Sequence, residues 1–171
     1  MPANVDDVLR FHPRCPFGPG VRHPCLVALM RNPTTDTPTG IHRIALTGEA
    51  CKIDRRMLGC WGAVKLWPAA AQLVVGEGIE TVLAAATRIP WRGAPLRPAW
   101  SAVSSGALGR FPVISGVERL IVLVDHDLAG KSAALVCTKH WQRAGRTVVR
   151  LTPKRAGADF NDLVPPVEPM S

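Results

Sequence analysis

Several residue types and patterns are missing from this 171-residue sequence, and each absence excludes a class of protein. The chain contains no tyrosine, so no reaction through a covalent tyrosyl intermediate can occur on this polypeptide alone. No apolar run approaches the roughly 18 residues that a membrane-spanning helix needs. Residues 1–7 also lack the basic start and apolar stretch of a signal peptide. We therefore expect a cytoplasmic protein with no membrane partner.

Closely spaced cysteine pairs are also missing. The five cysteines are Cys15, Cys25, Cys51, Cys60 and Cys137. The odd count and the expected cytoplasmic setting argue against a disulfide framework. Cys15 and Cys25 with His12 and His23 are the one candidate zinc set, but structural zinc sites usually bring their ligands in tight pairs. We expect no zinc.

Acidic residues are scarce. Lys and Arg number 21 against 13 Asp and Glu, which gives a net charge of +8 and a pI near 10.0. The segment between Glu80 and Glu118 contains no carboxylate and four arginines. A basic balance favours a polyanionic partner such as nucleic acid, although solubility alone is an alternative explanation.

What is present describes a globular chain whose character changes near residue 70. Apolar residues make up 47% and charged residues 20%, and the length suits one domain with a small appendage. Residues 1–70 are rich in turn formers, with two strands expected at 25–30 and 41–47. We interpret them as a strand-rich N-terminal appendage. Residues 71–165 form the main domain, and 166–171 form a C-terminal tail.

The main domain alternates strand and helix patterns. Strands are expected at 72–76, 100–103, 120–124 and 147–151. Helices are expected at 79–88 and 130–144, the second ended by Gly145. This β-α-β-β-α-β order predicts an α/β fold with a mostly parallel four-stranded sheet flanked by helices.

Acidic side chains follow two of these strands. Glu77 comes directly after the first strand, and Asp125 and Asp127 follow the third. Ligands of open α/β sheets bind at the carboxyl ends of the strands, so the three carboxylates are expected to converge there. Taken singly, Asp125 could be a helix N-cap and Glu77 an exposed loop residue. Together they favour Mg²⁺, with Mn²⁺ as the substitute, held by Asp125 and Asp127, with Glu77 either a further ligand of the same ion or a general acid or base.

Groups suited to phosphate surround these carboxylates. Gly78 and Gly130 let backbone N–H groups approach a ligand at the helix starts. The expected phosphate or nucleic-acid ligands among the basic residues are Lys131, Lys154 and Arg155. Asp159, in a third acidic motif, is a further candidate metal ligand.

Three motifs together resemble a known family. They are Glu77-Gly78-Ile79-Glu80-Thr81, Asp125-His126-Asp127-Leu128-Ala129-Gly130 and Asp159-Phe160-Asn161-Asp162. Their order and spacing are similar to the Toprim domain of bacterial-type primases, topoisomerases and some nucleases. Residues 11–14, 23–24 and 40–43 also resemble the segment before Toprim in primase-like proteins of phages, plasmids and integrated elements.

The resemblance implies a Toprim-like, Rossmann-type core and a Mg²⁺-dependent nucleotidyltransferase that makes RNA primers on single-stranded DNA. Glu77 would be the general acid or base, and Asp125 and Asp127 would hold the metal, joined by Asp159. Single-stranded DNA and nucleoside triphosphates are the implied partners, with a helicase or zinc-module subunit as a candidate.

Some positions depart from the primase pattern, and three alternatives follow. Thr81 and Asn161 stand where primases tend to have acidic residues, and no Cys/His zinc module occurs in the sequence. A Toprim nuclease that cleaves phosphodiesters is one alternative. A catalytically weak nucleic-acid-binding accessory protein is another. A haloacid-dehalogenase-like phosphatase fits poorly, because it leaves Glu77 unexplained.

Overall fold

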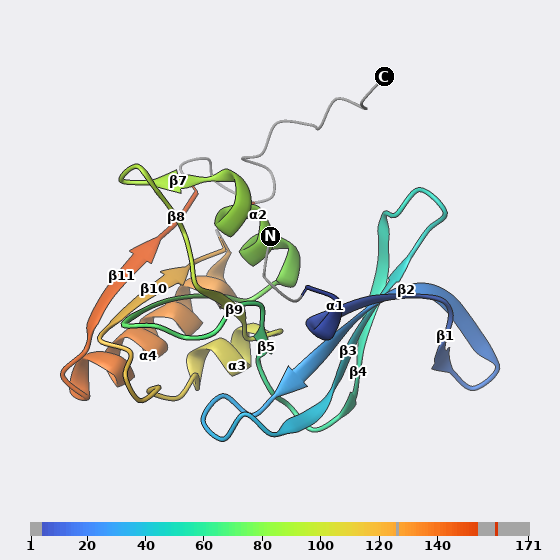
Figure 1. Ribbon diagram of the computed structural model, residues 1–171, viewed down its shortest axis with the longest axis horizontal. Coiled ribbons are helices and arrows are strands. Elements are labelled where there is room, and N and C mark those ends of the chain that lie inside the picture. The colour runs from blue at the N-terminus through green and yellow to red at the C-terminus, as the bar shows by residue number, and fades with distance from the viewer. Residues whose placement is uncertain (1–4, 126, 154–159, 161–171) are drawn as a thin grey trace. The chain divides into compact units, whose positions relative to one another are not determined.

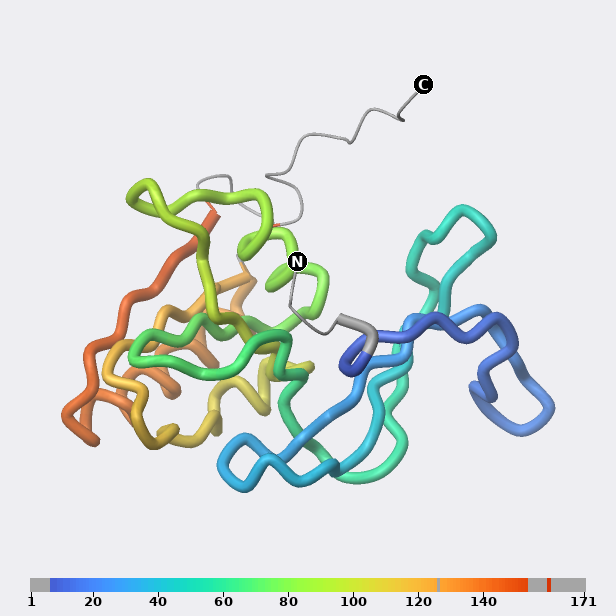
Figure 2. Tube along the Cα trace, viewed as in Figure 1, coloured from blue at the N-terminus to red at the C-terminus, as the bar shows by residue number. Residues whose placement is uncertain are grey.

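The structure is a computed structural model that describes residues 5–125, 127–153 and 160. The chain divides into two compact units, Met1–Leu66 and Trp67–Ser171 (Figures 1 and 2). The first is built on an antiparallel sheet, and the second on strands that pair in parallel. The α/β character and the strand-rich N-terminal segment predicted from the sequence are confirmed.

The N-terminal unit holds a four-stranded antiparallel sheet in the order β1-β2-β3-β4. Its elements are α1 (Val5–Val8), β1 (Leu9–Gly18), β2 (Val21–Arg31), β3 (Pro38–Leu46), β4 (Lys52–Gly59) and the short β5 (Val64–Lys65). The expected strand pair corresponds to β2 and β3, whereas β1 and β4 were missed. Pro13 and Pro16 obscured β1; they are tolerated because β1 is an edge strand whose register shifts near both. β4 gave no alternating pattern because all its residues are exposed.

Side chains from three strands of this sheet form a small apolar core. Cys15, Phe17, Cys25 and Ala45 are buried together, with Val27 beside them. The guanidinium groups of Arg43 and Arg56 lie 5.7 and 5.0 Å from the centroid of the Phe17 ring, within the range of a cation–π contact. These arginines therefore cover the small apolar core with their own charged groups.

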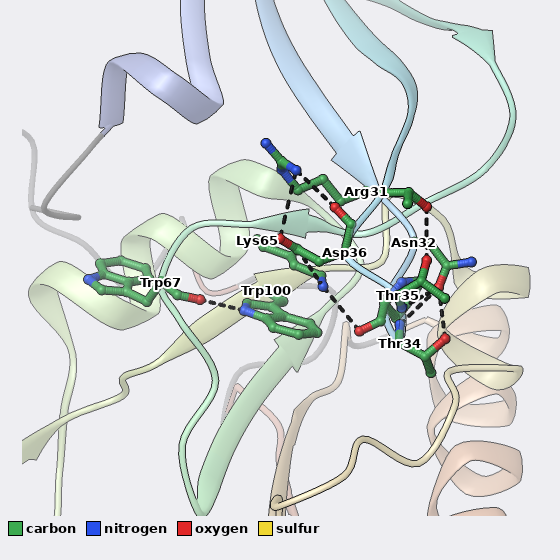
Figure 3. Close-up of polar contacts among 10 residues, drawn as sticks. Arg31, Asn32, Thr34, Thr35, Asp36, Lys65, Trp67 and Trp100 are labelled. Atoms are coloured by element: carbon green, nitrogen blue, oxygen red, sulfur yellow. Dashed lines mark hydrogen bonds and ion pairs between the residues drawn. The ribbon is translucent and has the colours of Figure 1, made fainter.

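The turn between β2 and β3 is held by side-chain hydrogen bonds (Figure 3). Oδ1 of Asn32 accepts from the backbone N–H groups of Thr34 at 2.9 Å and Thr35 at 3.1 Å. Asp36 in the same turn forms an ion pair with Lys65, whose Nζ lies 2.8 Å from Oδ1. The turn-forming residues that separate the two expected strands thus act through an Asx-type turn.

Four strands of the C-terminal unit lie side by side in the order β11-β10-β6-β9, and each neighbouring pair is parallel. They are β6 (Gln72–Gly76), β9 (Ala99–Ser101), β10 (Arg119–Leu123) and β11 (Thr147–Leu151). The helices are α2 (Ile79–Arg88), α3 (Ser105–Gly109) and α4 (Leu128–Arg143), and a small hairpin consists of β7 (Pro90–Trp91) and β8 (Ala94–Pro95). The expected order lacked α3 and the hairpin, which are too short to show a periodic pattern.

The core of this unit explains its strand sequences. Leu120, Ile121, Val122 and Leu123 of β10 are all buried, as expected for a central parallel strand covered on both faces. α2 contacts β6 and β9, α4 contacts β10 and β11, and α3 packs on α4. Beyond the end of α4, Gly145 has a φ of 75° and its N–H bonds to the carbonyl of Gln142 at 2.9 Å, which confirms its predicted role in ending the helix.

Within the described part of the chain, no helix combines the length and the apolar character that crossing a membrane requires.

Candidate metal and phosphate site

Two neighbouring strands bring the predicted carboxylates to one edge of the sheet. β6 and β10 pair in parallel, with Val75 opposite Val122. Glu77 lies two residues after Val75, and Asp125 lies three residues after Val122. Since paired strands lie about 4.8 Å apart, both residues leave the sheet at the same edge. Both are half-buried.

Asp127 begins α4. Its Oδ1 atom accepts a hydrogen bond from the N–H of Gly130 at 2.6 Å, and its backbone is extended, as in an N-cap residue. The N-cap role that the sequence allowed for Asp125 thus belongs to Asp127. A carboxylate at this position is favoured by the helix dipole. Because a carboxylate has two oxygens, capping by Oδ1 leaves Oδ2 able to bind a cation.

Gly130 allows the start of α4 to approach the end of β10. A Cβ atom on this residue would lie 2.9 Å from the carbonyl oxygen of Asp125 and 3.2 Å from Oδ1 of Asp127. Real Cβ atoms do not come this close to backbone, so a larger residue would displace one of the two aspartates. The structure therefore gives Gly130 a packing role, and its phosphate contact stays a prediction.

The backbone at Glu77 is held from the neighbouring strand β9. The hydroxyl of Ser101, which is fully buried, donates to the carbonyl of Glu77 at 2.6 Å and accepts from the N–H of Val103 at 3.1 Å. Val103 has a φ of 61°, a rare conformation for a β-branched residue and one that is often found near functional sites. Sequence reasoning missed Ser101. Its only signal is a serine inside an otherwise apolar strand.

The start of α2 lies next to this loop. Gly78 is the N-cap residue of α2 and has no side chain to cap it. Thr81 is buried in the first turn, and a Cβ on Gly78 would lie 3.2 Å from its Oγ1 atom. Thr81, where primases tend to carry an aspartate, thus packs inside the domain and offers no carboxylate to the edge of the sheet.

A cavity of about 540 Å³ lies between the ends of β10 and β11 and the first turn of α4, and its lining includes Val124, the residue before Asp125. It is lined by Val124, Lys131, Val148, Arg150 and Thr152. Lys131 was predicted as a phosphate ligand, whereas Arg150 was missed because it lies within the predicted strand and not in a loop. Lys131 and Arg150 are suited to bind a phosphate group that also coordinates a metal ion.

The third acidic motif cannot be placed here. Asp159, Lys154 and Arg155 lie outside the described residues. Among the residues that are described, no three His, Cys, Asp or Glu side chains group closely enough to hold a metal ion. The donor set at the sheet edge is nevertheless made of carboxylate oxygens, which Mg²⁺ prefers, and one or two carboxylates plus substrate phosphates are its usual ligands.

Comparison with models of known protein families assigns most of the C-terminal unit to one family. The Toprim domain model matches residues 72–165, which is more than half of the chain. The chain belongs to the Toprim domain family. Glu77, Asp125, Asp127 and the lysine–arginine cavity all lie within the matched Toprim domain. Residues 1–74 match a second model, a domain of unknown function (DUF7146).

A solved structure shows the same fold. It is described as the crystal structure of a DNA primase domain from Pseudomonas aeruginosa, and it matches with a TM-score of 0.53 and 18% sequence identity. The match covers 81% of this chain and 46% of the primase chain, so this chain spans about half the length of that structure. No curated protein matches the sequence.

Proposed function

We propose that this Toprim protein is a Mg²⁺-dependent nucleotidyltransferase of the DNA primase type, or the catalytic part of one, which makes RNA primers on single-stranded DNA. The observation that carries the proposal is the shared edge of β6 and β10. Glu77 and Asp125 leave the paired strands there, Asp127 begins α4 beside them, and the cavity with Lys131 and Arg150 adjoins. The Toprim match and the shared fold with a primase domain support the reaction class.

Each side chain has a role in this reaction. The 3′-hydroxyl oxygen of one nucleotide attacks the α-phosphorus of the next, and pyrophosphate leaves. Glu77 accepts the hydroxyl proton, and its position depends on the Ser101 hydrogen bond to its own carbonyl. Lys131 and Arg150 offset the charge of the triphosphate.

Asp125 and Asp127 would hold the metal, with Asp159 as a further candidate ligand. When bound, Mg²⁺ supplies charge neutralisation for the phosphates and orients them. Mn²⁺ is expected to substitute, because it accepts the same oxygen ligands. The remaining predicted contacts to nucleic acid are Gly78, Gly130, Lys154 and Arg155. A helicase or zinc-module subunit is the proposed source of template recognition.

The test is primer synthesis on single-stranded DNA with labelled ribonucleotides and Mg²⁺. The decisive variant carries Asp125→Asn and Asp127→Asn together, because asparagine keeps the shape of both residues and also caps helices well. We expect its activity to fall at least about a hundredfold while its melting temperature stays close to that of the wild type. Equal primer synthesis by the two proteins would contradict the proposal.

The departures at Thr81 and Asn161 make a Toprim nuclease the second candidate. Thr81 is buried and has no carboxylate, so a multi-metal site of the primase type would lack one ligand at this position. Magnesium-dependent nicking of plasmid DNA, with no incorporation of nucleotides, would favour cleavage. Salt-sensitive DNA binding without turnover in Mg²⁺ or Mn²⁺ would instead favour an accessory binding protein.

A further inference from the structure

A second cavity, with three cationic side chains among its lining residues, lies in the C-terminal unit between the end of α3 and the C-terminal half of α4. Figure 1 shows these two helices. Its volume is about 400 Å³. We call it the α3–α4 pocket, and it is lined by Gly109, Arg110, Val136, Lys139, His140 and Arg143. None of these described lining residues is a carboxylate, and the sequence pattern does not mark them as a group.

The helical repeat places most of this lining on one face of α4. Val136, Lys139, His140 and Arg143 are spaced at i, i+3, i+4 and i+7, so they form one stripe along the helix. The buried stripe of α4 is separate and contains residues such as Ala133 and Trp141.

The other two lining residues, Gly109 and Arg110, lie at the end of α3. A Cβ on Gly109 would lie 3.6 Å from the Cα of Ala133 in α4, so the end of α3 lies close against α4. This approach brings Arg110, the next residue, to the stripe on α4.

Among the residues that the structure describes, no carboxylate pairs with the cations of the pocket. None of the side chains of Arg110, Lys139 and Arg143 forms an ion pair within the part of the chain that the structure describes. Lys139 and Arg143 are four residues apart, and like charges at this spacing repel each other. The C-terminal end of the helix dipole offsets part of that repulsion. A bound anion would offset the rest.

The pocket is separate from the carboxylate site. Lys139 lies twelve residues beyond Asp127 along α4, which corresponds to about 18 Å at 1.5 Å per residue. The same helix thus has Asp127 at its N-cap and a cluster of cations in its last two turns. A ligand in the α3–α4 pocket would not touch the reacting groups.

We propose that the α3–α4 pocket binds the phosphodiester backbone of a nucleic-acid strand outside the reaction site. The cations stand about one helical turn apart, about 6 Å between Cβ atoms, which is comparable to the spacing of successive phosphates. The half-exposed Val136 adds an apolar contact for a sugar. A net charge of +8 makes a polyanion the natural ligand.

The test measures binding of the full chain to a fluorescein-labelled single-stranded oligonucleotide by anisotropy, over a range of salt concentrations. The buffer contains EDTA, so metal chemistry is not measured. The test variant carries Arg110→Gln, Lys139→Gln and Arg143→Gln. We expect its affinity to fall at least about tenfold and the slope of log K against log salt to become shallower by about 2, since each phosphate contact on a single strand contributes about 0.7.

The matched control keeps the charge at the same three positions, with Arg110→Lys, Lys139→Arg and Arg143→Lys. It should bind like the wild type, and thermal unfolding should show all three proteins folded. Unchanged affinity and slope in the glutamine variant would overturn the proposal, as would an equal loss in the control. Selective binding of poly-glutamate in place of DNA would also overturn it and would indicate an acidic protein partner.

The inference rests on the proposed function only for the class of the ligand. Binding in EDTA and primer synthesis are separate measurements. A chain that binds DNA through the pocket without making primers would refute the proposed reaction alone. If the glutamine variant made primers and bound DNA as well as the wild type does, the proposal for the pocket alone would be refuted.

Discussion

The two ends of α4 differ in charge and in their surroundings. At its beginning, Asp127 caps the helix, two residues after Asp125, which follows β10 at the same edge of the sheet as Glu77 follows β6. In its last turns, Lys139, His140 and Arg143 meet Arg110 from α3. Each end carries the charge that the helix dipole favours. Our two proposals assign the reaction to the acidic end and the binding of a nucleic-acid strand to the basic end.

The largest effect should come from removing the proposed base at the acidic end. Glu77→Gln keeps the size of the side chain and the backbone contact to Ser101. We expect kcat for primer synthesis to fall by about 10² to 10⁴, the usual contribution of a general base. The affinity for single-stranded DNA in EDTA should stay within about twofold of the wild type. A parallel loss of binding would break the proposed separation of the two ends.

Gly130→Ala should disturb the acidic end through packing. Alanine normally stabilises a helix relative to glycine by up to about 1 kcal/mol. Here its Cβ would lie 2.9 Å from the carbonyl oxygen of Asp125, so we expect a loss of about 1–3 kcal/mol in the free energy of unfolding. Urea denaturation measures it.

The matched control for this change is Gly106→Ala in α3. This glycine is exposed, and a Cβ there would meet no atom within 4 Å. We expect neutral or slightly increased stability. If both glycine variants were equally stable, the close approach of α4 to Asp125 would be wrong.

Two substitutions of Asp127 separate its cap from its charge. Asp127→Ala removes the hydrogen bond to the N–H of Gly130 and should cost about 1 kcal/mol, whereas Asp127→Asn should cost almost nothing. Both should lose primer synthesis, because neither leaves a carboxylate for the metal. Thermal unfolding and the primer assay check the two effects. Full activity of the asparagine variant would show that Asp127 acts only as a cap.

The middle of α4 should be chemically inert, in contrast to both of its ends. Burial raises the pKa of the Cys137 thiol to about 12, so almost no thiolate exists near neutral pH. Cys51 and Cys60 are exposed. Iodoacetamide should therefore label these two in the native protein, and Cys137 only after unfolding. Rapid native labelling of Cys137 would contradict the packing of α4 on the sheet.

Part of the fold and of the site followed from local sequence patterns. Glu77, Asp125 and Asp127 stand directly after buried β-branched runs, and Gly145 follows a helical pattern, so their positions could be inferred from neighbours in the chain. β1 was missed because Pro13 and Pro16 suppress strand signals, although an edge strand tolerates them. Ser101 was missed because its partner Glu77 is distant in sequence, and Arg150 because it lies inside a predicted strand and lines the cavity together with residues distant in sequence.

The sequence by itself determined the order of acidic motifs, the strands that precede them and the family resemblance. Each depends on residues within a few positions of one another. Only the tertiary structure decided that Asp127 and not Asp125 caps α4, that Ser101 holds Glu77, and that Arg110 joins the basic stripe of α4. The last two join segments that meet only when helices and strands pack, whereas the cap bond is local and depends on where β10 ends and α4 begins.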